Sequence, residues 1–169
     1  MRTFRFVVVC SALLVSGSVV ARATVAPSEP SGSLAVFNAV GTLAVHGDGV
    51  IFGVVGQGSL VLVNYRPGVP GATPMVSGAT AHVEDGLVVY SGANIRFLLP
   101  EGRYSIQTSG SGIDLSAVGR GAISSIPPAN AGPSGPPPGG LVALDGASFA
   151  SFSAFGSSPG IFGPHALPS

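Results

Sequence analysis

The chain of 169 residues contains no lysine and no tryptophan. Its charged residues are seven arginines and seven acidic residues, which give a formal net charge of +0. So few cationic side chains cannot form a basic stripe that neutralises a nucleic-acid backbone or holds an anionic membrane surface. We therefore expect no nucleic-acid partner.

Cysteine is nearly absent as well, because Cys10 is the only one and lies in an amino-terminal apolar segment. Once that segment is removed, the chain can form no disulfide and offers no thiolate nucleophile or metal ligand. The sequence also lacks the nucleophile-elbow, phosphate-loop and His-Glu-x-x-His patterns that mark common catalytic centres. We expect neither a catalytic site nor a cofactor, and hence a protein that is not an enzyme.

The amino terminus has the pattern of a secretory signal peptide. Residues 1–23 begin with Arg2 and Arg5, continue with an apolar run, and end with the small residues Ala21 and Ala23. An uncleaved membrane anchor is the alternative, but the apolar run is shorter than the ~20 residues that span a bilayer. We expect cleavage after Ala23, no membrane span afterwards, and a secreted protein that is extracellular or held in the cell envelope.

Residues 33–126 have the pattern of many short strands. Runs rich in Val, Ile, Leu, Phe and Tyr are bounded by Gly, Asn, Asp or Pro, which is typical of antiparallel strands joined by tight turns. This pattern predicts a single small all-β domain, an antiparallel β-sandwich or barrel, after a flexible leader at 24–32. Strands are expected near 35–38, 42–46, 50–55, 59–65, 80–84, 87–90, 95–99, 104–108, 113–118 and 122–126.

The segment around Glu101-Gly102 predicts a hairpin with a two-residue turn. In this register apolar residues of the two strands face each other, with Leu99 opposite Tyr104 and Phe97 opposite Ile106. The alternation also places Arg96 and Arg103 on the outer face, and Asp114 outside while its two neighbours point inward. Further hairpin turns are predicted at Asp48-Gly49, Gly56-Gln57-Gly58 and Asp85-Gly86, and a long surface loop at 66–78.

Residues 127–169 are rich in Pro, Gly and Ser and predict a disordered low-complexity tail. Two features leave an alternative open. Residues 141–144 could form another strand, and four phenylalanines could make the segment a sticky region for self-association or for a partner: Phe149, Phe152, Phe155 and Phe162.

Four side chains of the strand region are candidates for a binding patch. Arg96, Arg103 and Arg120, with Asp114 beside them, could hold an anion or contact a partner on the outer face. The alternative is a cross-strand ion pair between Asp114 and one arginine, which at a surface contributes only about 0–1 kcal/mol.

A metal-dependent hydrolase is a further, weaker hypothesis. His46 and Asp48, and likewise His82 and Glu84, are two residues apart, so each pair projects to one face of its strand. If the two strands were neighbours, the four side chains could form a mixed nitrogen and oxygen metal site. Acidic residues at exposed turns explain the same pattern without a metal.

The stretch from Val88 to Ile123 resembles a group of small exported all-β proteins from high-GC bacteria. The features that carry the resemblance are Arg96-Phe97, Gly102-Arg103-Tyr104 and the block from Gly112 to Gly121. That group has no assigned activity, so the resemblance implies the fold and export but no catalytic residue. This chain differs in having few basic residues.

Together these observations favour an exported, non-catalytic interaction or structural module that meets an envelope or extracellular partner. The exposed strand face and the long loop are the expected contact surfaces. The alternative is a β-barrel that binds a small molecule or an anion in its interior or at the arginines.

Overall fold

A computed structural model describes residues 31–126, 139–152 and 158–164. Strands make up 81% of these residues, and none of them lies in an α-helix, which confirms the all-β class. Consistent with this, the same ranges hold no helix long and apolar enough to cross a membrane.

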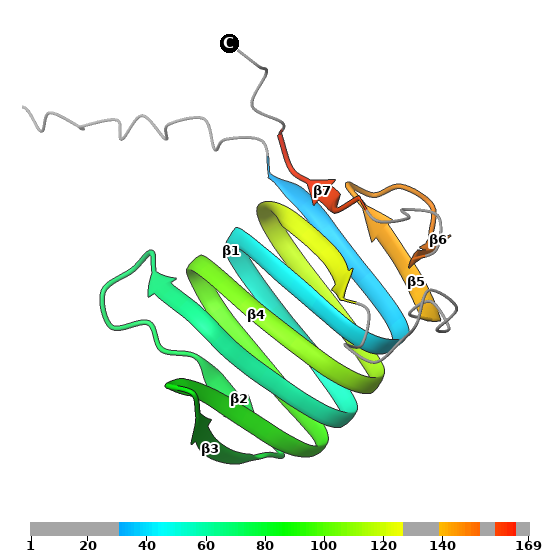
Figure 1. Ribbon diagram of the computed structural model, residues 1–169. Helices are drawn as coiled ribbons and strands as arrows, with labels where there is room; N and C mark the ends of the chain where they lie inside the picture. The colour runs from blue at the N-terminus through cyan, green and yellow to red at the C-terminus, as the bar shows by residue number, and fades with distance from the viewer. Residues whose placement is uncertain (1–30, 127–138, 153–157, 165–169) are drawn as a thin grey trace, which may run out of the picture.

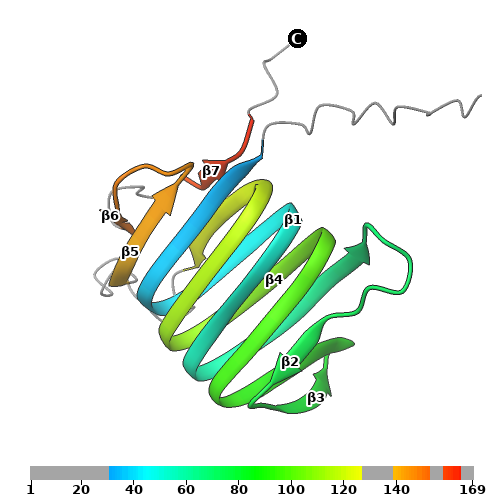
Figure 2. The same cartoon turned by 180° about the vertical axis from the view of Figure 1, so that it is seen from behind.

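Two long strands, β1 (Gly32–Pro67) and β4 (Leu87–Ile126), form most of the fold. They run antiparallel and wind together as a flattened coil (Figure 1), and the view from behind shows the same winding (Figure 2). Thr108 of β4, for example, pairs with Leu43 on one side and with Leu60 on the other. Because Leu43 and Leu60 belong to the same strand, adjacent windings of the coil hydrogen-bond to each other.

Five short strands extend this coil. β2 (Met75–Ser77), β3 (Thr80–Glu84) and β7 (Gly160–Phe162) pair with β4, whereas β5 (Gly139–Leu144) pairs with β1 and β6 (Ala150–Ser151) with β5. All seven strands belong to one antiparallel sheet, and this sheet is not closed. The single all-β domain expected from the sequence is thus a coiled sheet folded into two layers.

Rows of glycine mark the places where the long strands bend from one layer to the other. Gly49 of β1 pairs with both Gly102 and Gly119 of β4, and a second row lies about half a winding away. At Gly49 an added Cβ would fall on the carbonyl oxygen of Val118 in the next winding. All six glycines of the two rows have φ between +117° and +158°, a region that residues with a side chain avoid: Gly41, Gly49, Gly58, Gly102, Gly110 and Gly119.

These bends correct three of the predicted hairpins. Asp48-Gly49 and Glu101-Gly102 lie inside β1 and β4, and Leu99 pairs with Ile51 rather than with Tyr104. The reason is that an extended glycine with positive φ turns the strand around a corner without reversing it. Gly56-Gln57-Gly58 likewise lies inside β1. The turn at Asp85-Gly86 is confirmed, since both residues have positive φ and join β3 to β4.

The core lies inside the coil and consists mainly of alternate residues of both long strands. The predicted inward faces are confirmed: Ile113, Leu115 and Ala117 are buried, and so are the side chains that the sequence placed on the inner face around residue 101. The largest fully buried side chains are Leu34, Leu43, Val45, Ile51, Val55, Leu60, Ile95, Leu99, Ile106, Ile113, Leu115 and Phe162. Apolar side chains therefore fill the interior of the coil.

The described part of the segment after residue 126 also belongs to this body. The strand expected at 141–144 is present as part of β5, and Phe152 and Phe162 are buried in the core. The all-β domain therefore extends beyond Ile126, and residues 139–152 and 158–164 are not part of a tail. Residues 1–30, with the predicted signal peptide and leader, 127–138, 153–157 with Phe155, and 165–169 lie outside the described residues.

Candidate functional site

The glycine bends divide the outer surface into two faces of different character. One face, here called the apolar face, is formed by outward side chains of the neighbouring strand segments that lie on the same side of the coil as residues 50–56. Its members are Ala35, Phe37, Val50, Phe52, Val54, Met75, Leu98, Pro100, Val118 and Leu141. Phe52, Met75 and Val118 are 50%, 56% and 53% exposed. Exposed apolar side chains that are contiguous in this way mark interaction sites more often than scattered ones do.

The opposite face is more polar. Many of its outward positions carry hydroxyl, amide or imidazole side chains, alongside apolar ones such as Val61 and Ile126. The Thr42 Oγ1 and Ser109 Oγ atoms are hydrogen-bonded at 2.9 Å. The polar residues of this face include Thr42, His46, Ser59, Ser105, Gln107, Ser109 and Ser124. The two faces together make the domain amphipathic.

Arg96 and Asp114 are the charged residues of the apolar face. In the sheet they lie on either side of Val54, because Val54 pairs with both of them. The Asp114 carboxylate accepts a hydrogen bond of 2.7 Å from the Asn38 backbone N–H, which holds its position. The four side chains Phe52, Val54, Arg96 and Asp114 line a shallow hollow of about 340 Å³.

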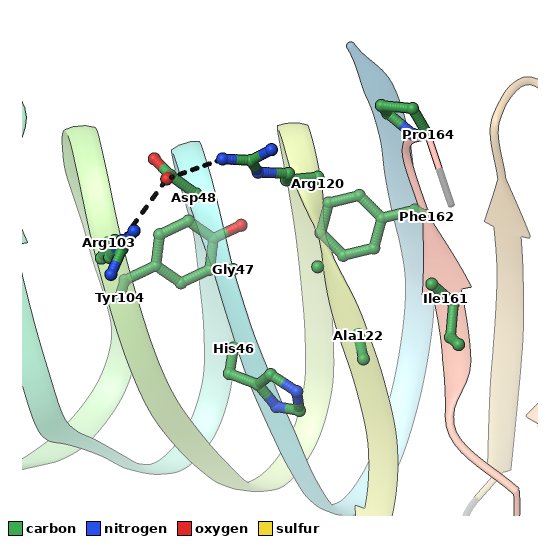
Figure 3. A pocket seen from close by; sticks show the side chains of 11 residues that line it. His46, Gly47, Asp48, Arg103, Tyr104, Arg120, Ala122, Ile161, Phe162 and Pro164 are labelled. Carbon is green, nitrogen blue, oxygen red and sulfur yellow. Dashed lines mark ion pairs between the residues drawn. The ribbon is translucent and has the colours of Figure 1, made fainter. Parts of the chain in front are cut away.

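Arg103 and Arg120 lie elsewhere, beyond the bend at Gly49. They flank Asp48, whose Oδ2 atom is 3.6 Å from Arg103 Nε and 3.7 Å from Arg120 Nη2 (Figure 3). The four candidate residues therefore do not form one patch. They form two groups, and in the second group Asp48 offsets part of the arginine charge.

An open groove of about 670 Å³ lies beside the Asp48 group. Figure 3 shows Tyr104 and Phe162 along it, with Ile161 and His46 at its sides. Gly47 and Gly121 leave room for the two rings, since an added Cβ would come within 2.9 Å of Tyr104 Oη and of Phe162 Cζ, respectively.

Tyr104 has an unusual environment for a phenol. Its side chain is 3% exposed, and within the described ranges its hydroxyl has no hydrogen-bond partner. Burial and, to a smaller extent, the Asp48 carboxylate raise the pKa of Tyr104 above its ordinary value of about 10. A buried hydroxyl without a partner costs free energy, so this group works against stability.

Replacing Tyr104 with Phe is expected to raise the free energy of unfolding by about 1 kcal/mol, because the unpaired hydroxyl is removed and the ring is kept. The gain should grow above pH 10. There the unfolded chain releases the Tyr104 proton while the folded chain retains it, so the wild type loses stability as the pH rises. Urea unfolding of both proteins at neutral pH and above pH 10 measures both effects. A Tyr104→Phe protein less stable than the wild type at both pH values would show that the hydroxyl has a partner.

The two His-carboxylate pairs do not meet. His46 lies in β1 beside Ser105 and Ala122, whereas His82 lies in β3 beside Val89 and is 3.6 Å from Glu84. No group of three or more metal-ligating side chains occurs in the part of the chain that the structure describes. The geometry gives the hydrolase hypothesis no support.

Sequence reasoning missed the apolar face as a site. The signal was available, since Phe52, Leu98 and Val118 occupy outward positions of their predicted strands. What the sequence lacked was the register that brings these three strands side by side.

Comparison with known proteins gives no match to a family model, a curated protein or a solved structure.

Proposed function

We propose that this chain is an exported, non-catalytic interaction module of the cell envelope or extracellular space, and that the apolar face is its contact surface. The observation that carries the proposal is the exposure of large apolar side chains in adjacent strands, led by Phe52, Met75 and Val118. Export rests on the signal-peptide pattern of residues 1–23 and on the resemblance to small exported all-β proteins.

The long loop adjoins the same face. Residues 68–74 leave β1, and the Gly68 N–H donates a hydrogen bond of 2.8 Å to the Glu101 carbonyl, which ties the start of the loop to β4. Val69 in the loop is 54% exposed, and the loop ends at Met75, whose neighbour in the sheet is Leu98 of the apolar face. A partner on the apolar face would therefore also contact the loop.

Two properties of the structure make the alternative of a ligand-binding barrel weaker. Buried apolar side chains of the described residues pack together inside the coil, which disfavours a ligand site in the interior. The arginines expected to bind an anion together are separated by the bend at Gly49, and Asp48 offsets part of the charge of two of them.

The test is capture of partners from culture fluid or envelope extract on the immobilised chain. We expect Phe52→Ser and Val118→Ser to reduce capture at least ~10-fold, because a hydroxyl at the centre of an apolar contact loses more than 1.4 kcal/mol of binding. Val63→Ser is the matched control, since Val63 is 45% exposed on β1 outside the apolar face. Equal capture by all four proteins, or capture of nothing by the wild type, would reject the proposal.

A further inference from the structure

The apolar face has a self-complementary arrangement of charge and size. Val54 lies in the middle, Arg96 is one strand away on one side, and Asp114 is one strand away on the other. The part of the chain that the structure describes shows no ion pair between these two residues. Consider a second copy related to the first by a 180° rotation about an axis that lies in the plane of contact, above Val54 and parallel to β1. This rotation exchanges the two sides of the face. Each charge then faces the opposite charge of a second, identical surface.

Side-chain size follows the same symmetry. One cross-strand row of the apolar face reads Met75, Leu98, Phe52, Ser116 and Ala35, in the order of the paired strands. The same rotation sets Phe52 against Phe52, Leu98 against Ser116, and Met75 against Ala35. Large side chains therefore meet small ones on both sides of a central aromatic pair, as in the aligned packing of two sheets.

The extent of the face is compatible with a specific dimer. Strands lie ~4.8 Å apart and rise ~3.3 Å per residue. About five to six neighbouring strand segments, each half a winding long, therefore cover roughly 600 Å². Specific protein interfaces bury about 800 Å² per partner, and weaker ones bury less. The area is thus at the lower end of what two copies need.

We infer that the apolar face pairs with the same face of a second copy of this chain, in a two-fold arrangement that sets Arg96 of each copy against Asp114 of the other. The inference rests on the proposed function, because it names a second copy as the partner of the apolar face. Such an interface is isologous, so the Arg96–Asp114 pair occurs twice and a single charge reversal alters both pairs.

Sedimentation velocity of the full mature chain tests this arrangement. We expect a concentration-dependent dimer for the wild type, and at least ~10-fold weaker dimerisation for Arg96→Asp and for Asp114→Arg, each measured alone, since like charges then oppose each other across the interface. An equimolar mixture of the two variants should recover dimers that contain one copy of each. A folding defect cannot produce that recovery.

Two further comparisons keep the test decisive. Arg66→Asp makes the same change of charge at an exposed residue outside the apolar face and should dimerise like the wild type. If a charge reversal prevents folding, Arg96→Gln and Asp114→Asn replace it. Asp114→Asn keeps an acceptor for the Asn38 N–H, and each neutral variant should weaken dimerisation and its dependence on salt.

A wild-type monomer at every concentration, or a mixture that forms no mixed dimer, would overturn the inference. The proposed function fails separately, since it is lost if the wild type captures no partner or if Phe52→Ser and Val118→Ser do not reduce the capture. A monomer whose partner capture depends on those two residues therefore rejects the second copy and retains the contact surface.

Discussion

Replacing Gly110 with Ala is expected to destabilise the domain by about 3–5 kcal/mol, a large share of the ~5–15 kcal/mol that stabilises a typical domain. Gly110 pairs with Gly41 on one side and with Gly58 on the other, at the centre of one bend row. Its φ of +141° lies in a region that costs a residue with a side chain about 1–3 kcal/mol. The methyl group would also fall on the Gln57 carbonyl oxygen and within 2.8 Å of Gly58 Cα.

The clash cannot be relieved by a side-chain movement, because both contacted atoms belong to the backbone of the neighbouring winding. Either the two windings separate and lose hydrogen bonds around the bend, or the strand changes its path. For this reason the expected cost exceeds that of an ordinary glycine replacement.

Gly86→Ala is the matched control for this prediction. Gly86 also has a positive φ, +78°, but no atom lies within 4 Å of an added Cβ there. It should cost about 1–2 kcal/mol, the strain of the left-handed conformation alone. Urea unfolding followed by far-UV circular dichroism measures both variants. Equal losses at Gly110 and Gly86 would contradict the role of the glycine rows in spacing the windings.

The same glycines explain why the sequence predicted the strands well and their connections poorly. Alternation of apolar and polar residues is local, so the inward faces at 95–99 and 113–117 could be predicted. A glycine between two such runs fits a hairpin turn and a bend equally well. The choice depends on residues far away in the chain, such as Val118, whose carbonyl oxygen lies against Gly49.

The candidate site shows the same limit. Arg96, Arg103 and Asp114 were predicted to lie on the outside of the sheet, and the alternation of their strands places them there. The structure does not gather these three residues and Arg120 in one patch, because the bends at Gly102 and Gly119 put Arg103 and Arg120 beside Asp48, whereas Arg96 and Asp114 lie beside Val54. Register between distant strands decides such groupings, and no local pattern encodes it.

The carboxy-terminal segment is a second place where distant contacts decide the structure. Asp145 follows β5, and one of its carboxylate oxygens accepts hydrogen bonds of 3.0 Å from the backbone N–H groups of Ser33 and of Gly163. The start of β1, the end of β5 and the residue after β7 are thereby joined at one carboxylate. Composition alone suggested a tail here, because Pro, Gly and Ser dominate the segment.

Phe162→Ala tests whether this segment stabilises the domain. Phe162 is 1% exposed, and its ring packs over Gly121 of β4. Removing a buried phenylalanine ring costs about 3–5 kcal/mol, because the apolar contacts are lost and a cavity remains. Thermal unfolding should therefore show a much lower midpoint for this variant than for the wild type.

Phe149→Ala provides the comparison within the same segment, because Phe149 is 53% exposed and should contribute less than about 0.5 kcal/mol. If the segment lay on the surface of the coil without stabilising it, both variants would lower the unfolding midpoint only slightly and by similar amounts. A large loss at Phe162 and almost none at Phe149 would instead mean that residues well beyond Ile126 complete the core. Partner and self-association assays then require the chain with this segment in place. Its removal would uncover the part of β4 around Gly121 and damage the domain that carries the apolar face.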